Sequence, residues 1–285
     1  MKPAAFEYEC PQQLDAALAL LNDANSRILA GGQSLVPMMN FRLATPSRLV
    51  DINKLPDLDY VRDAGDAVEI GALARHAQVY ASNEVAQHFP IMKAAYEWIA
   101  HSAVRNRGTL CGNLCHADPA SEMPAIMQVL EAQLTLSSAS GARVVVATDF
   151  FKGSYETAIA ADEMLTMLSI SKPAPGTGWG FEEVAMRKGD YAWCTVAATL
   201  QLSSGKIASA RVAVSGVDAC ATRLSDAESS LDGQAPDTEL FANVAASAAL
   251  AVDPADNVAV SADYRRDLVR TLMPRVLQAA VESAG

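Results

Sequence analysis

The chain has 285 residues, of which 51% are hydrophobic and 19% charged, an ordinary balance for a globular protein. Its formal net charge of −11, with no block of Lys and Arg, argues against binding to nucleic acid or anionic membranes. The residues from Met1 to Glu7 lack the apolar core of a signal peptide, and no apolar run reaches the length of a membrane span. The five cysteines are scattered and odd in number, which favours reduced thiols, so we expect a cytoplasmic protein with no membrane span.

The first sixty residues predict a small parallel unit. Apolar residues at helical spacing over 14–21 precede a short buried strand at 27–30. A second strand at 48–52 follows a helical segment at 35–41. Two strands joined by a helical crossover are expected to lie parallel in one sheet.

The middle of the chain predicts a mixture of helices and strands. The expected elements are strands at 68–70 and 164–170, helices at 91–100 and 121–130, a loop at 109–118, and a hairpin of 133–136 with 143–146. Asp118 and Pro119 are typical of a helix start, with Asp as the N-cap and Pro at the first helical position.

The last part of the chain predicts an antiparallel sheet covered by helices. The segment KPAPGTG at 172–178 is the clearest linker. Beyond it we expect strands at 179–185, 197–202 and 208–214 and helices at 240–251 and 264–281. The fold class is therefore α+β, with a division at about residue 173.

A glycine-rich segment follows the strand at 27–30. Ala30-Gly31-Gly32-Gln33-Ser34-Leu35 lets the backbone turn sharply and bring successive N–H groups close to an anion, with the Ser34 hydroxyl as a further donor. It lacks the Gly-Lys-Ser/Thr ending of a P-loop and the Gly-x-Gly-x-x-Gly of a dinucleotide fold. Taken alone, the segment is equally consistent with an ordinary strand-to-helix turn.

A second segment, Arg105 to Asn113, also offers glycines, a hydroxyl and an amide side chain. Downstream, the string HADPASE places a carboxylate at the head of a helix, where it would either cap the helix or accept hydrogen bonds from a ribose diol. Two phosphate-binding loops and a ribose acceptor suit a dinucleotide better than a mononucleotide.

Three strings of this sequence together resemble a known family. They are AGGQSLVPMMNFRLATPSRLVDI, RNRGTLCGNLCHADPASEMPA and MRKGDYAW, in this order. With them, essentially the whole chain resembles the FAD-binding medium subunit of the molybdenum hydroxylases, a family that includes the medium subunit of carbon monoxide dehydrogenase and the flavin domain of xanthine dehydrogenase. The resemblance implies an FAD-binding domain of the vanillyl-alcohol-oxidase (PCMH) type at 1–172, with a small parallel subdomain at 1–57 and a mixed one at 58–172. A C-terminal α+β domain of the CO dehydrogenase flavoprotein type would follow at 178–285.

The resemblance also implies a division of labour between subunits. A large molybdopterin subunit would oxidise the substrate, and a small subunit would relay electrons through two [2Fe–2S] clusters. This chain would pass them through FAD to an external acceptor, and the three chains would assemble as a dimer of heterotrimers.

Position by position, the resemblance implies a set of FAD contacts. The pyrophosphate would be held by Leu29, Ala30, Gly31, Gly32, Gln33, Ser34 and Leu35 and by Thr109, Gly112 and Asn113. Glu122 would hold the adenosine ribose, Ile99 and Leu165 would line the adenine or flavin pocket, and Arg187, Lys188, Asp190 and Tyr191 would lie near the isoalloxazine ring. No catalytic or metal-binding side chain is expected here, so the chemistry would belong to the cofactor.

Cys111 stands where this family usually has the first of two adjacent glycines. If the position requires a positive φ, the cysteine costs about 1 kcal/mol of strain, whereas a need for small size alone would tolerate it. Together with Cys115 and His116 it also suggests a metal site. Structural zinc needs four ligands, however, so packed thiols are favoured.

Two other functions stay open at this point. One is a stand-alone flavin oxidoreductase acting directly on a small organic substrate, which would need an acid–base residue over the flavin and a substrate pocket of its own. The other is a flavin-free scaffold for the partner subunits. Retention of FAD by the purified protein separates the second from the rest.

Overall fold

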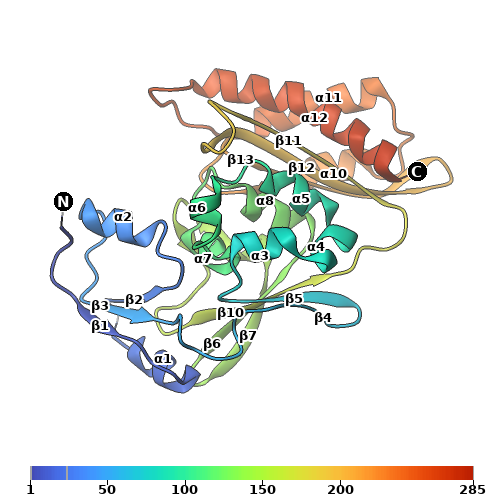
Figure 1. Ribbon diagram of the computed structural model, residues 1–285. Coiled ribbons are helices and arrows are strands. Elements are labelled where there is room, and N and C mark those ends of the chain that lie inside the picture. Colours follow the sequence, from blue (N-terminus) through green and yellow to red (C-terminus); the bar gives the residue numbers. More distant parts are fainter. Residues whose placement is uncertain (1, 24, 285) are drawn as a thin grey trace.

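The computed structural model describes residues 2–23 and 25–284 and has three main sheets with helices between and outside them (Figure 1). The N-terminal sheet is parallel. Its strands lie in the order β1 (Glu7–Glu9), β3 (Arg48–Asp51), β2 (Ser26–Leu29). Helix α1 (Leu14–Leu20) joins β1 to β2, and α2 (Leu35–Asn40) joins β2 to β3. The predicted parallel unit is confirmed, and β1, a short exposed strand that the pattern missed, extends it. The expectation that the strand at 27–30 is buried is wrong, because Arg27 is exposed and Ile28 and Leu29 are only half-buried.

The middle sheet is antiparallel and has five strands. Their order is β4 (Val61–Asp63), β5 (Ala67–Gly71), β10 (Met164–Ser171), β6 (Gln133–Ser138) and β7 (Gly141–Val146). The predicted hairpin and the two predicted strands are confirmed. A short helix and a two-stranded ribbon follow β7, namely α9 (Ala147–Phe150), β8 (Phe151–Gly153) and β9 (Glu156–Thr157).

A layer of helices lies between the middle sheet and the C-terminal sheet (Figure 1). It consists of α3 (His76–Ala81), α4 (Asn83–His88), α5 (Pro90–Tyr96), α6 (Ser102–Arg105), α7 (Leu110–His116) and α8 (Glu122–Val129). The larger hydrophobic core fills the space between these helices and the middle sheet, where Tyr96, Ile126 and Leu168 are fully buried.

The C-terminal sheet is an antiparallel meander, as predicted. Its strands are β11 (Thr177–Ala185), β12 (Ala192–Ser203), β13 (Lys206–Ser215) and β14 (Thr222–Arg223). One face lies against α5 and α8, and the other is covered by α10 (Ser225–Leu231), α11 (Thr238–Ala251) and α12 (Ala262–Ala284). No helix within the described residues combines the length and apolar character needed to cross a membrane.

The segment expected as a loop at 109–118 is instead helix α7, so that prediction is wrong. Leu110, Cys111 and Leu114 bury one side of the helix in the core, and this packing outweighs the low helix propensity of Gly112. Glycine, threonine and asparagine in one short segment suggested a loop, but tertiary contacts decide its conformation.

The predicted start of the next helix is also wrong. Helix α8 begins at Glu122 with Ser121 as the N-cap residue. The Asp118 carboxylate does not cap the helix, because it accepts the Ala120 N–H at 2.9 Å within the preceding turn. Asp118 and Pro119 therefore form a turn that leads into the helix.

Two further boundaries differ from the predicted ones. The helix expected at 91–100 ends at Tyr96, and Ala100 has a left-handed φ of 44°, which no helix interior accepts. Strand β11 begins at Thr177, so the last residues of the predicted linker belong to the sheet. The division of the chain at about residue 173 stays a prediction.

Candidate functional site

The first glycine segment lies at the carboxyl end of β2, between that strand and α2. This edge of a parallel sheet is where ligands commonly bind. Gly32 has a φ of 71°, which a side chain rarely adopts. Gly31 is constrained by space, because a Cβ there would overlap the carbonyl oxygen of Arg107 and lie 2.7 Å from the Gly108 Cα. The two glycine segments, distant in sequence, therefore meet at Gly31.

The main-chain N–H groups of the first segment are available to a ligand. Within the described residues, none of the N–H groups of 31–34 donates a hydrogen bond to another group of the protein. The segment borders a pocket of about 390 Å³. The pocket is lined by Leu29, Ala30, Gly31, Gly32, Gln33, Val36, Pro37, Asp51, Asn53 and Arg107. Free amide donors facing one hollow are the arrangement that binds an anion.

One arginine lines this pocket, and a second is bonded to residues that line it. Arg107 lines it, and Arg75 donates hydrogen bonds to the Arg107 carbonyl and, at 2.6 Å, to Asn53 Oδ1. Asn53 in turn donates to the Ala30 carbonyl at 2.8 Å, which fixes the start of the glycine segment. Burial lowers the pKa of Arg75, and the positive charge of Arg107 lowers it further. A bound anion would relieve this repulsion between neighbouring cations.

The second glycine segment uses its Gly112 and Asn113 amides within the protein. Thr109 is the N-cap of α7, and its Oγ1 accepts the Gly112 N–H at 3.0 Å while its carbonyl accepts the Asn113 N–H at 3.0 Å. The Asn113 side chain exchanges two hydrogen bonds with the Ser121 hydroxyl, at 2.9 and 3.1 Å. The amides of Gly112 and Asn113 that were expected to grip a phosphate are thus engaged in the helix cap, unlike those of the first segment.

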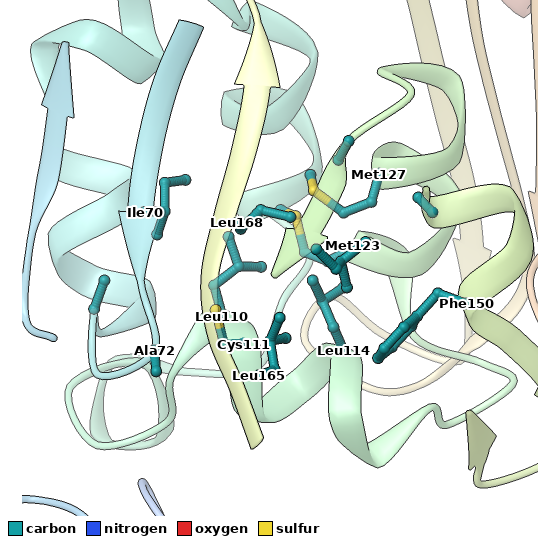
Figure 2. Close-up of a cluster of buried hydrophobic side chains, with 14 of the residues drawn as sticks. Ile70, Ala72, Leu110, Cys111, Leu114, Met123, Met127, Phe150, Leu165 and Leu168 are labelled. Carbon is teal, nitrogen blue, oxygen red and sulfur yellow. The ribbon is translucent and has the colours of Figure 1, made fainter. Parts of the chain in front are cut away.

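Cys111 occupies its position without backbone strain, since its φ is not positive. Its side chain is buried, with Sγ 3.8 Å from the Gly71 carbonyl oxygen, and Figure 2 shows it in the apolar cluster beside Leu110 and Leu165. Burial raises the pKa of the thiol well above its usual range. The position therefore requires a small apolar residue. The thiol packs in the core and is unreactive.

Three of the predicted contact residues are nearly closed to solvent. Ile99, Glu122 and Leu165 are 6%, 5% and 3% exposed. Leu165 lies in the larger hydrophobic core, in the apolar cluster of Figure 2. Glu122 lies at the first turn of α8, directly after Ser121. Their contact with a cofactor stays a prediction.

The loop with Arg187, Lys188, Asp190 and Tyr191 connects β11 to β12 and is largely exposed. Arg187 pairs with Asp190 at 2.8 Å, and Lys188 pairs with Glu97 at 3.1 Å. Gly189 has a φ of 93°, and a Cβ there would lie 3.3 Å from the Ala100 carbonyl oxygen. These contacts place the loop beside Ala100, which follows Ile99. The structure therefore brings together the predicted pocket residue Ile99 and the loop predicted to lie near the isoalloxazine ring.

Comparison with known proteins identifies the family of this chain. The model of the FAD binding domain in molybdopterin dehydrogenase matches residues 4–173, and the model of the CO dehydrogenase flavoprotein C-terminal domain matches residues 179–280. The chain belongs to this family of FAD-binding medium subunits. It is an oxidoreductase flavoprotein subunit with the α+β fold of the family.

Individual relatives cover the whole chain. The nicotine 6-hydroxylase medium subunit of Paenarthrobacter nicotinovorans is 38% identical over 97% of this chain and 98% of its own. The carbon monoxide dehydrogenase medium chain of Hydrogenophaga pseudoflava is 35% identical over 98% of each. A chain in the structure of carbon monoxide dehydrogenase from the same organism, in a form lacking the Mo-pyranopterin moiety of the molybdenum cofactor, superimposes with a TM-score of 0.97 at 34% identity over 100% of both chains.

The residues present fit the cofactor named by the family model. FAD carries a pyrophosphate, and the first segment offers unengaged amides and two glycines at positions that disfavour a side chain, while Arg107 of the second segment lines the pocket. Sequence reasoning missed Asn53, Arg75 and Arg107. Asn53 carried a signal, since it directly follows the strand predicted at 48–52 and therefore lies at the ligand-binding edge of the parallel sheet, and Arg107 lies within the second glycine segment, whereas Arg75 carried none.

Proposed function

We propose that this chain is the electron-transfer subunit of a molybdenum hydroxylase, passing electrons from [2Fe–2S] clusters of a small partner subunit, through FAD, to an external acceptor. A large molybdopterin subunit would oxidise the substrate, and the three chains would assemble as a dimer of heterotrimers in the cytoplasm. Residues 1–172 would form the FAD-binding domain and residues 178–285 the C-terminal domain.

One observation carries the proposal. In an acidic chain of net charge −11, unengaged main-chain N–H groups and Arg107 converge on a single pocket at the carboxyl edge of a parallel sheet. Such a site attracts a pyrophosphate through oriented dipoles and one local cation, with no need for a basic surface. Membership in the FAD-binding family supports the pyrophosphate of FAD as the ligand of this pocket.

The proposed roles follow the position of each group. Leu29 to Leu35 would hold the pyrophosphate, and Thr109, Gly112 and Asn113 would contact it from the second segment, which meets the first at Gly31. Glu122 would lie at the ribose, and Ile99 and Leu165 would supply apolar surface. Arg187, Lys188, Asp190 and Tyr191 would lie over the isoalloxazine, where a cation balances negative charge on the ring.

FAD supplies chemistry that no side chain here provides, because it accepts electrons singly or in pairs and releases them to a different partner. The protein's part is to hold the ring at a fixed position, exclude water from it and present it to the partner subunit. The names of the relatives span nicotine and carbon monoxide oxidation, so the substrate class is set by the partner's pocket.

Purification of the affinity-tagged chain from its own host tests the proposal. We expect a yellow complex with one FAD for each copy of this chain, together with a molybdopterin-containing chain and a chain carrying two [2Fe–2S] clusters, identified by mass spectrometry and metal analysis. Substrate added to the complex should bleach the flavin, and the isolated chain should show no such bleaching. Bleaching of the isolated chain by a small organic substrate would favour a stand-alone oxidoreductase, and a colourless complex would contradict both.

A further inference from the structure

A buried row of polar side chains crosses the face of the C-terminal sheet that lies against α8. Glu183 on β11 is paired in register with Thr195 on β12, which is paired with Ser215 on β13. Each of the three is at most 5% exposed. Thr195 Oγ1 donates to Glu183 Oε2 at 3.4 Å, whereas Glu183 Oε1 and Ser215 Oγ have no hydrogen-bond partner within the described residues. We call Glu183, Thr195 and Ser215 the polar row.

Helix α8 places Glu122 at this row. Near the C-terminal end of the helix, the Thr199 hydroxyl donates to the Val129 carbonyl at 3.2 Å. Just before its N-terminal end, the Pro119 carbonyl accepts the Gly216 N–H at 2.7 Å, next to the β13 end of the polar row. The helix therefore runs along the sheet with its first residue, the buried Glu122, at the polar row.

Two enclosed acids in this position disfavour each other's ionisation. Burial raises the pKa of Glu122, and burial together with the negative charge of Glu122 raises the pKa of Glu183. No salt bridge within the described residues reaches either carboxylate. The other titratable groups whose charges interact with the pair are Asp118, Tyr96, Tyr191 and Cys194. Like charges in one enclosed site share protons as a pair.

We propose that Glu122 and Glu183 form a carboxyl pair that keeps one proton at neutral pH and takes up a second when negative charge arrives at the FAD site. The inference rests on the proposed function, because it needs FAD to be bound near the pair. The link is Ser121, which directly precedes Glu122 and is bonded to Asn113, a proposed FAD contact. Electrons from the reduced iron–sulfur clusters bring the negative charge, and a proton from water binds the remaining carboxylate. When the electrons leave for the acceptor, that proton returns to water.

The first test concerns the chain alone and needs no cofactor. The folded pair binds protons more tightly than the unfolded chain, so the free energy of unfolding falls as pH rises above about 4.5, the region where unfolded glutamates ionise. The substitution Glu183→Gln removes one of the two acids. Urea unfolding at pH 5 and pH 8.5 should therefore show a smaller loss of stability at the higher pH in Glu183→Gln than in the wild type.

Glu182→Gln is the matched control. Glu182 is the neighbour of Glu183 on β11 but pairs with Arg275 of α12 at 2.9 Å, on the opposite face of the sheet. This variant should keep the pH dependence of the wild type. Equal pH dependence in Glu183→Gln and wild type would overturn the proposal. If Glu183→Gln fails to fold, the infrared carbonyl band of a protonated carboxylic acid in the wild type at pH 7 decides, and its absence overturns the proposal as well.

The second test reads the link to the cofactor in the assembled complex. In the pH range where the pair titrates, the reduction equilibrium of the bound flavin should change with pH more steeply in the wild type than in Glu183→Gln. The two slopes should differ by up to a tenfold change in the reduction equilibrium constant per pH unit, which corresponds to about 30 mV per pH unit for a two-electron couple. Equal slopes would overturn the link to charge at the FAD site. A complex that lacks FAD would refute the proposed function instead, and the unfolding test would still report on the pair.

Discussion

Glycines bring one stretch of main chain against another at two places in this molecule, with different results. At Gly31 the first glycine segment touches the Arg107–Gly108 backbone, and the neighbouring N–H groups face a pocket. At Gly178 and Gly180 of β11, helix α12 lies directly on the strand, and Cβ atoms there would overlap the carbonyl oxygens of Ala280 and Val276. Side chains are excluded at Gly31 and at Gly178 and Gly180, but only beside Gly31 are main-chain N–H donors left unengaged.

The difference lies in what the neighbouring polar groups do. Gly178 and Gly180 sit within the ladder opposite Leu200 and Ala198, and at the intervening Trp179 both main-chain groups bond the Ser283 hydroxyl, at 2.7 and 2.9 Å. Between the two glycines, the strand edge is therefore paired with the last turn of α12. Close approach of backbones by itself indicates packing, and unengaged N–H groups beside it indicate a site.

The largest effect is expected at the packed glycines. In Gly180→Ala the new Cβ meets the carbonyl group of Val276, which belongs to a helix backbone and cannot turn aside. We expect a loss of about 3 kcal/mol or more in the free energy of unfolding, measured by urea denaturation. Gly153→Ala is the control, since its φ is not positive and its Cβ would have an ordinary 3.4 Å contact with Glu156 Oε2. Equal stability of the two variants would show that α12 can shift away from β11.

A smaller effect on stability but a specific effect on FAD is expected at the first segment. Gly31→Ala forces the segment away from Arg107 and misplaces the free amides. FAD affinity in the assembled complex should fall about 100-fold, which corresponds to about 3 kcal/mol. Released flavin is measured by fluorescence after dilution, with Gly153→Ala again as control. If the folded fraction of Gly180→Ala also lost FAD, the effect on FAD would not be specific to the first glycine segment, and the difference between the two glycine regions would be contradicted.

The sequence predicted the parts of this fold that depend on local pattern. The strands at 27–30 and 48–52 formed a parallel unit because short apolar runs bounded by turn residues and joined by a helix permit little else. The antiparallel meander beyond residue 177 was equally predictable from its strands. The first glycine segment was recognisable because two adjacent glycines directly follow a short apolar strand.

The parts that depend on tertiary packing were not predictable. The segment at 109–118 looked like a loop but becomes a helix once Leu110 and Leu114 enter the core. Gly178 looked like part of a linker, because nothing local reveals that α12 packs on it. Nothing in the string FEEVA indicates that Glu183 is buried, and it is buried because β11 turns that face toward α8.

The smallest effect is expected at the second glycine segment. In Gly112→Ala the new Cβ lies 2.6 Å from Thr109 Oγ1, a side-chain atom that can rotate away at the cost of its cap hydrogen bond. Losing that bond costs about 1 kcal/mol, and the higher helix propensity of alanine returns about the same amount. Stability should therefore change by less than about 1 kcal/mol, and FAD affinity in the complex by less than about tenfold.

Gly112→Ala is also the sharpest test of the contrast between the two phosphate-binding candidates. If its amide stays bonded to Thr109 in the loaded protein, FAD affinity measured by flavin release should be far closer to the wild type than that of Gly31→Ala. A loss as large as that of Gly31→Ala would mean that the cap of α7 opens when FAD binds and that its amides turn to the phosphates. The Gly112 amide would then bind the ligand although it is hydrogen-bonded in the cofactor-free chain. In that case, unbonded amides in the cofactor-free chain would no longer distinguish a binding segment from a segment that is only packed.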